Sequence, residues 1–138
     1  MTFEDDLSAQ DEANNFVDLP IQLNGTLYTF RFYEWSGIQW ANEADNHPAR
    51  PGVEFDVMYG YNIRTLALAA AKVTGRRLDA DGETLLAPQM WDAIFRSAGG
   101  GVVQEICDSI WGLNVLKPLQ AVEAAKKASA ASSALTSD

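Results

Sequence analysis

Apolar and polar residues alternate on both sides of Asn24-Gly25, and this pattern predicts a β-hairpin over residues 17–33. A two-residue loop fixes the register, because the numbers of paired residues must sum to 49. This register pairs Ile21 with Tyr28, Leu19 with Phe30 and Val17 with Phe32. The three apolar pairs lie on one face, and other elements must cover that face because a lone hairpin is not stable in water.

Apolar residues at intervals of three and four predict four helices after the hairpin. Their expected ranges are 34–45, 56–74, 88–98 and 102–113. Asp56 is expected to cap the start of the second helix, and Pro88 suits the first position of the third. We expect a loop over 78–87, a break at the glycines 99–101, and an end to the fourth helix at Asn114.

The two ends of the chain differ in composition from its middle. Residues 1–15 are acidic and polar and are expected to form a disordered arm. Residues 118–138 are rich in Ala and Ser and are expected to form a weak helix that fades into a flexible tail. The fold class predicted from these patterns is α+β and mainly helical, with the N-terminal hairpin packed on about four helices in one domain over 16–117.

Charge and composition narrow the classes of partner. The 138 residues carry a net charge of −9, which repels phosphate backbones and anionic lipid. No apolar run approaches the ~20 residues that span a bilayer. We therefore expect a cytoplasmic protein that binds neither nucleic acid nor membrane.

Chemistry-bearing residues are few. The chain has one His, His47, and one Cys, Cys107, and these are too few for a zinc site without carboxylates at suitable spacing. Cys107 lies near the apolar face of a predicted helix, so we expect its thiol to be buried. The alternative is a nucleophile paired with His47. The glycines at 99–101 lack the Lys and Ser/Thr of a phosphate-binding loop. We expect no enzyme activity, no metal and no cofactor.

Two of the four tryptophans are candidates for partner contacts. Trp35 and Trp91 lie on predicted apolar stripes and are expected in the core. Trp40 lies off the stripe that Trp35 begins, and Trp111 lies beside the stripe of its own helix. These two are candidate partner-binding residues if they are exposed, and core residues if they are not.

The order of these parts resembles a known family. An acidic start precedes the hairpin Leu-Asn-Gly-Thr-Leu-Tyr-Thr-Phe-Arg-Phe, and Glu34-Trp35 then opens a helix. Apolar helices and a polar Ala/Ser/Lys tail follow. Over about residues 17–128 the chain looks like the tail assembly chaperones of long-tailed (siphovirus-type) bacteriophages, especially those of actinobacteria, although residues 47–52 match nothing in that pattern.

The resemblance implies a function without chemistry. Such proteins bind the helical, aggregation-prone tape measure protein in the host cytoplasm, keep it soluble until tail tube subunits assemble around it, and are absent from the mature virion. Many also occur in a longer form made by ribosomal frameshifting, for which Ala125, Lys126 and Lys127 are the candidate position here. The implied partners are therefore the tape measure protein, the longer form, tail tube subunits and further copies of the chain. The alternative is a small structural virion protein of the tail or the head–tail connector.

Overall fold

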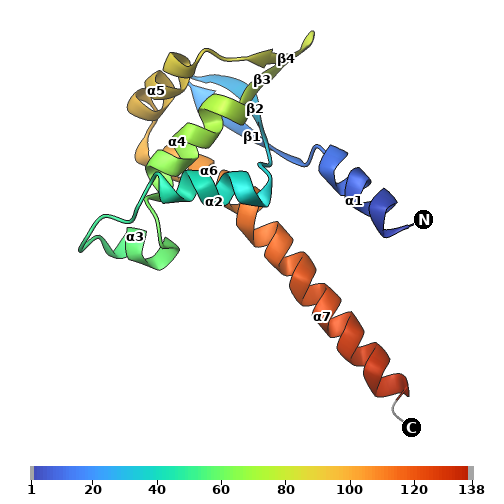
Figure 1. The fold of residues 1–138 in the computed structure, drawn as a ribbon. Coiled ribbons are helices and arrows are strands. Elements are labelled where there is room, and N and C mark those ends of the chain that lie inside the picture. Colours follow the sequence, from blue (N-terminus) through green and yellow to red (C-terminus); the bar gives the residue numbers. More distant parts are fainter. Residues whose placement is uncertain (1, 137–138) are drawn as a thin grey trace.

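The protein has the expected α+β fold, with a small sheet and a larger set of helices (Figure 1). The computed structural model describes residues 2–136, with side chains up to residue 133. The helices are α1 Phe3–Glu12, α2 Gly37–Asp45, α3 Glu54–Tyr59, α4 Ile63–Thr74, α5 Pro88–Ser97, α6 Gly100–Trp111, the π-helix η1 Gly112–Leu116, and α7 Lys117–Thr136. The strands are β1 Phe16–Leu23, β2 Thr26–Tyr33, β3 Arg76–Asp79 and β4 Gly82–Leu85.

The N-terminal hairpin has the predicted register at every pair. Ile21 lies opposite Tyr28, Leu19 opposite Phe30, and Val17 opposite Phe32. The turn at Asn24 and Gly25 has positive φ at both residues, as a tight hairpin turn requires. The apolar face is covered, since α4 packs on β2 and α6 packs on β1.

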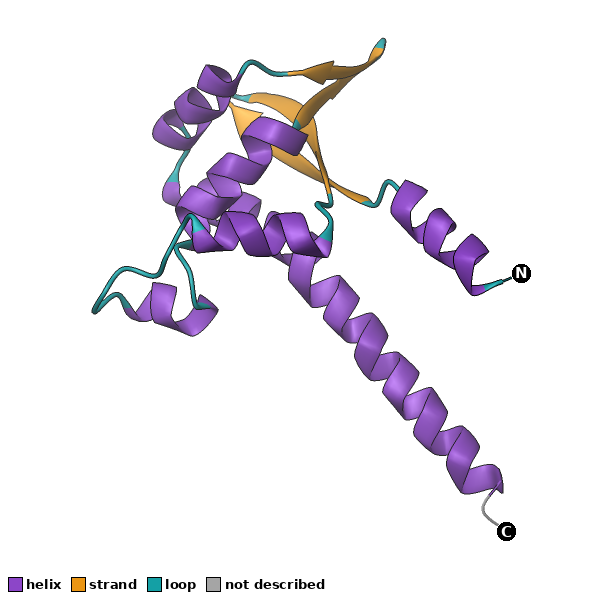
Figure 2. Cartoon of the chain, viewed as in Figure 1, coloured by secondary structure: helices purple, strands orange, loops and turns teal. Residues whose placement is uncertain are grey.

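A second hairpin occupies residues 76–85, where the sequence indicated a loop. β3 pairs with β2, and β4 pairs with β3, so the sheet is antiparallel in the order β1-β2-β3-β4. Figure 2 shows the strands together at one end of the body, with the β3–β4 hairpin reaching beyond the helices. The apolar pattern missed these strands because they are four residues each and β4 is exposed throughout.

The core is centred on Trp91, whose side chain is completely buried. Its ring lies 5.3 Å from the ring centroids of Phe30 and of Phe32, which come from the covered face of β2. Helices α4 and α6 supply most of the remaining buried side chains. These are Ile63, Leu66, Ala67, Ala70, Ala71 and Thr74 on α4, and Ile106, Cys107 and Ile110 on α6.

The expected helix over 56–74 is two helices. Gly60 has φ of 85°, a left-handed conformation that ends α3, and Asn62 then caps α4 by accepting a hydrogen bond from the Thr65 N–H. Asp56 is therefore not a cap. It lies inside α3, completely buried, and accepts hydrogen bonds from the backbone N–H, Nε and Nη2 of Arg50 at 2.8–3.0 Å.

The C-terminal helices form one continuous segment. Gly112 and Lys117 both have right-handed helical φ and ψ, so α6 passes through η1 into α7 without a break. Asn114 was expected to stop the helix. Instead it lies within the π-turn, accepts a hydrogen bond from the Trp35 N–H at 2.9 Å, and donates one to the Ile110 carbonyl. None of the helices in residues 2–136 combines the length and hydrophobicity needed to cross a membrane.

The N-terminal arm also differs from expectation, because Phe3–Glu12 is helical. Thr2 and Asp5 form a capping box in which each side chain accepts a hydrogen bond from the other's backbone N–H. No residue of α1 is buried, so local capping and its acidic first turn account for the helix. Of the ends expected to be disordered or flexible, Met1 and residues 137–138 lie outside the described residues.

Candidate protein-binding surface

Trp40 is a core residue, so of the two alternatives left open by the sequence it is the core one that the structure supports. Its side chain is 9% exposed and packs beside Trp35 and edge-on to Tyr61, with ring centroids at 6.2 and 6.0 Å. Trp40 lay off the predicted stripe because Trp35 was counted as part of the helix. Ser36 is the cap of α2, so Trp35 precedes the helix and does not define its buried face. Ile38, which is three residues after Trp35, is exposed.

Trp111 lies at the edge of the core and begins an apolar stripe. Its ring is partly buried and meets the Tyr59 ring of α3 edge-on, at 5.5 Å between centroids. Val115, one turn later in η1, is also partly buried against the core. Leu119 and Val122 follow at intervals of four and three residues, which keeps all four side chains on one side of the helical segment.

This C-terminal stripe (Trp111, Val115, Leu119 and Val122) continues past the edge of the domain. Leu119 and Val122 are 51% and 50% exposed on α7, and the neighbouring Leu116 is 37% exposed. Figure 1 shows α7 projecting away from the body of the protein. A helix that carries a stripe from the core into solvent offers its exposed half to another apolar helix.

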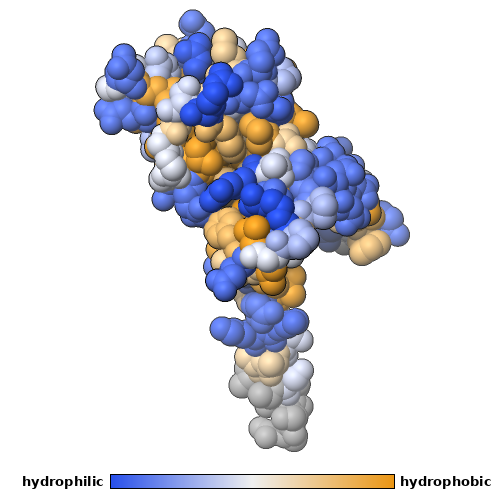
Figure 3. Space-filling model, turned by 90° about the vertical axis from the view of Figure 1, so that its left-hand side faces the viewer, coloured by the Kyte–Doolittle hydropathy of each residue, from blue (hydrophilic) through white to orange (hydrophobic). Residues whose placement is uncertain are grey.

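More apolar surface lies on α3, the helix that contacts Trp111. Val57 and Met58 are exposed there on a six-residue helix. Figure 3 shows hydrophobic side chains gathered across the middle of the face seen from the left of Figure 1, with polar surface above them. Methionine adapts its shape to irregular apolar partners. We therefore regard the C-terminal stripe together with α3 as the candidate protein-binding surface.

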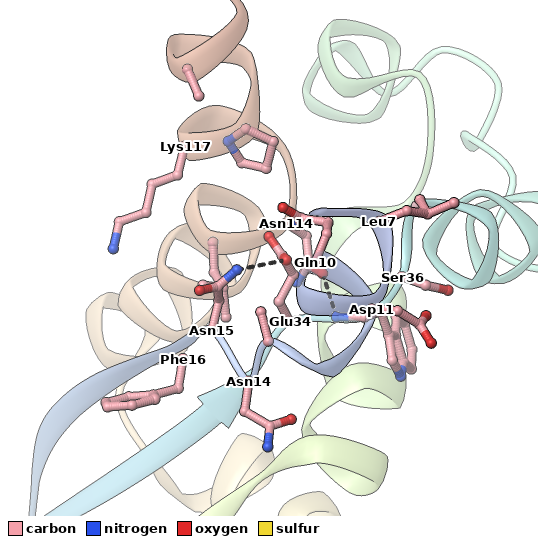
Figure 4. Close-up of a pocket in the computed structure, with 16 residues that line it drawn as sticks. Leu7, Gln10, Asp11, Asn14, Asn15, Phe16, Glu34, Ser36, Asn114 and Lys117 are labelled. Carbon is pink, nitrogen blue, oxygen red and sulfur yellow. Dashed lines mark hydrogen bonds between the residues drawn. The ribbon is translucent and has the colours of Figure 1, made fainter. Parts of the chain in front are cut away.

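A groove of about 940 Å³ lies between the start of α7 and the helix α1 (Figure 4). Leu7, Gln10 and Asp11 line it from α1, and Lys117, Pro118 and Ala121 line it from α7. Between these walls the lining includes Asn15, Glu34, Trp35, Leu113 and Asn114. The Asn15 amide donates to the Glu34 carboxylate at 3.3 Å, and the Trp35 indole N–H is buried with no hydrogen-bond partner among the described residues.

A network of charged side chains lies on the outer face of the sheet. The Arg31 guanidinium pairs with both oxygens of Asp18 at 2.7 and 3.0 Å, contacts Glu83 at 2.8 Å, and lies 3.7 Å from the centre of the Phe16 ring. The hydrogen bonds from Arg31 lower the pKa of the Asp18 carboxyl. The Tyr33 hydroxyl donates to Glu83 and, with Arg31, lowers the pKa of Glu83. Every charge has a partner, so the network stabilises the sheet and leaves no group poised for chemistry.

The two residues considered for chemistry have ordinary structural surroundings. The His47 ring contacts the Thr65 hydroxyl through Nδ1 at 2.9 Å and lies 3.9 Å from the Glu43 carboxylate. Cys107 is buried in α6, and burial raises the pKa of its thiol to about 11, which opposes formation of a reactive thiolate. Within residues 2–136 no three His, Cys, Asp or Glu side chains are grouped as metal ligands would be.

The candidate frameshift residues lie on the projecting helix. Ala125, Lys126 and Lys127 are exposed in α7, and the Lys126 ammonium lies 3.5 Å from the Glu123 carboxylate. The sequence reasoning missed Leu119 and Val122, although their spacing from Trp111 was a readable signal. The predicted stop at Asn114 concealed it by dividing the stripe between two segments.

Comparison with protein-family models, with curated proteins and with solved structures gives no match for this chain.

Proposed function

We propose that this chain is a tail assembly chaperone of a long-tailed bacteriophage, which binds the tape measure protein in the host cytoplasm and leaves it before the virion is complete. One observation carries the proposal: the C-terminal stripe extends from the core onto α7, where Leu119 and Val122 are half exposed. The order of parts that resembles the chaperone family supports it from the sequence.

A long apolar helix is a suitable client for this surface. Two helices pack at 8–10 Å when apolar side chains at intervals of three and four interlock. α7 is 20 residues long, about 30 Å, and so offers several turns to a partner. The net charge of −9 keeps a coated client soluble, because the complexes repel each other.

The proposal includes no catalysis and no cofactor. Both side chains that sequence reasoning considered for chemistry are engaged elsewhere, His47 with Thr65 and Cys107 in the core. His47→Ala should therefore leave client binding unchanged. The proposal also includes a longer form, produced by frameshifting at Ala125 to Lys127, that shares the domain and differs beyond the middle of α7. Such a form would keep the whole core, and its new segment would be placed to contact tail tube subunits.

The test is co-expression with the tape measure protein of the same phage. The wild-type chain should increase the soluble fraction of that client and co-purify with it. The double variant Leu119→Ser with Val122→Ser should weaken binding about tenfold or more, because it removes two apolar contacts from the interface centre. The matched control is Leu27→Ser with Leu85→Ser, which removes two exposed leucines from the sheet.

The control variant should bind as the wild type does, and both variants should keep the wild-type melting temperature, since all four side chains are exposed. Equal binding by the two double variants would place the client elsewhere on the chain. Failure of the wild type to bind or solubilise the client would overturn the chaperone proposal itself.

A further inference from the structure

Helix α1 projects from the body with its apolar side chains exposed. Phe3 is 75% exposed and Leu7 is 58% exposed, and they are four residues apart on one side of the helix. Leu7 lines the groove together with Gln10 and Asp11, so the apolar side of α1 is the side that faces α7. The nearest turns of α7 carry small residues on their groove side, Pro118 and Ala121, with Ala125 one turn further.

Both helices start from the same end of the groove. The C-terminal end of α1 and the N-terminal end of α7 line it. Both helices extend away from the body, with the two chain ends at their far ends (Figure 1). They would therefore run antiparallel if they came together. Matching the groove-lining residues places Asp11 beside Lys117, Leu7 beside Ala121, and Phe3 beside Ala125. Each step of four residues advances about 6 Å along both helices, so the three pairs stay level with one another.

The charges of the two helices are complementary. α1 contains five acidic residues and no basic one, whereas α7 contains three lysines and one glutamate up to Thr136. Lys117 has no ion pair among the described residues, and neither has Asp11. Large apolar side chains on one helix facing alanines on the other allow close approach of the two backbones.

The chain between α1 and the sheet can act as a hinge of two residues. Asn15 is fixed, because its carbonyl accepts a hydrogen bond from the Glu34 N–H at 2.9 Å and its amide contacts the Glu34 carboxylate. Ala13 and Asn14 are exposed, and Ala13 has an extended backbone conformation. A rotation at these residues moves α1 and leaves the domain unchanged.

From these observations we propose that α1 is a strap that closes on α7 of the same chain. In the closed form Phe3 and Leu7 pack on Ala125 and Ala121, and Asp11 pairs with Lys117. The closed strap fills the groove and so competes with any partner helix for it. The proposal concerns the isolated chain and holds whether or not the chain is a tail chaperone.

Disulfide trapping in the full-length protein tests the strap. The variant Leu7→Cys with Ala121→Cys should oxidise to an intramolecular disulfide at low protein concentration. The control, Leu7→Cys with Leu119→Cys, places the second thiol on the opposite side of α7, only about 3 Å away along the helix axis. The first pair should form its disulfide about tenfold faster, because bridging requires Cα atoms within ~7 Å. Native Cys107 is buried, and the wild-type chain serves as the blank for it.

A charge exchange adds a second measurement. In the Leu7→Cys, Ala121→Cys background, Asp11→Lys should slow disulfide formation about threefold, and adding Lys117→Asp should restore it. Restoration supports the pairing of Asp11 with Lys117. Equal rates for the two cysteine pairs, or a disulfide found only between two chains, would overturn the strap.

Discussion

Gly75 is the position where the structure leaves no room for a side chain. It follows α4 and lies under the Trp91 ring. A Cβ atom added there would lie 2.5 Å from the Ala71 carbonyl oxygen and 2.5 and 2.8 Å from two atoms of the Trp91 ring. Moving either neighbour would cost packing energy, because one is helix backbone and the other is a ring packed against Phe30 and Phe32.

The cost of Gly75→Ala can be worked from two opposing terms. Overpacking a well-packed core costs about 1–3 kcal/mol, and the rigid neighbours place this site near the upper end. The backbone at Gly75 has φ of −74°, which alanine accepts, so reduced entropy of the unfolded chain returns about 0.4–1 kcal/mol. The net loss is about 2 kcal/mol, equivalent to a fall in melting temperature of about 8 °C for a domain of this size.

Thermal and urea unfolding of the purified protein, followed by circular dichroism, measure this loss. The matched control is Gly101→Ala, since Gly101 lies in α6 and an added Cβ there meets nothing within 4 Å. The control should gain about 0.5 kcal/mol from the higher helix propensity of alanine. A Gly75→Ala variant as stable as the wild type would refute the packing of Trp91 against Gly75.

Three further predictions concern the hairpin, a buried carboxyl and the gene. Ile21→Asp should lower the free energy of unfolding by ~2–4 kcal/mol because Ile21 is buried, whereas Gln22→Asp on the outer face should lower it by under ~1 kcal/mol. Equal losses in urea unfolding would show that the face carrying Ile21 is not the one that the helices cover. Hydrogen bonds from Arg50 lower the pKa of Asp56 to about 2, so the stability they give is complete above about pH 4 and is lost as the pH falls through 2. Asp56→Asn should flatten the curve of unfolding free energy against pH between these values. An unchanged slope would contradict the pairing of Asp56 with Arg50. Codons GCA-AAA-AAG at residues 125–127 would contain the slippery heptamer A-AAA-AAG, and intact-mass data from infected cells should then show a longer species with the same N-terminus; other codons there, or a single species, would exclude this site.

The sequence predicted the elements whose pattern is strong and local. The register of the hairpin over 17–33 was predictable because Asn24-Gly25 fixes the loop length and three apolar pairs then share one face. α5 was predictable because Pro88 marks its start and Trp91 lies on its apolar stripe. In both elements local turn or cap chemistry and burial favour the same structure.

Elements that depend on distant contacts or on conflicting signals were not predictable. β3 and β4 are short and polar, and β3 is held in place by pairing with β2, which lies more than 40 residues earlier. α3 and α4 appeared as one helix because the left-handed conformation of Gly60 leaves no apolar signal. Helix α1 carried a readable capping signal in Thr2 and Asp5, but its acidic composition favoured disorder.

The candidate protein-binding surface was also predictable only where the sequence signal is local. The spacing of apolar residues does not show that α2 begins after Trp35, so the predicted apolar stripe excluded Trp40. Trp40 is buried through contacts such as that with the Tyr61 ring, which lies 21 residues later in the chain. Trp111 is the start of a stripe whose exposed half, Leu119 and Val122, was not predicted from the sequence. Only the π-turn at Gly112–Leu116, which carries the helix past Asn114, joins the two halves.

Quantitative mass spectrometry of infected-cell lysate and purified virions tests the proposed function most directly. A tail assembly chaperone should be abundant in the lysate, should co-purify there with the tape measure protein, and should be absent from purified particles. A fixed copy number of this chain in every particle would contradict the chaperone proposal and identify a structural subunit of the virion.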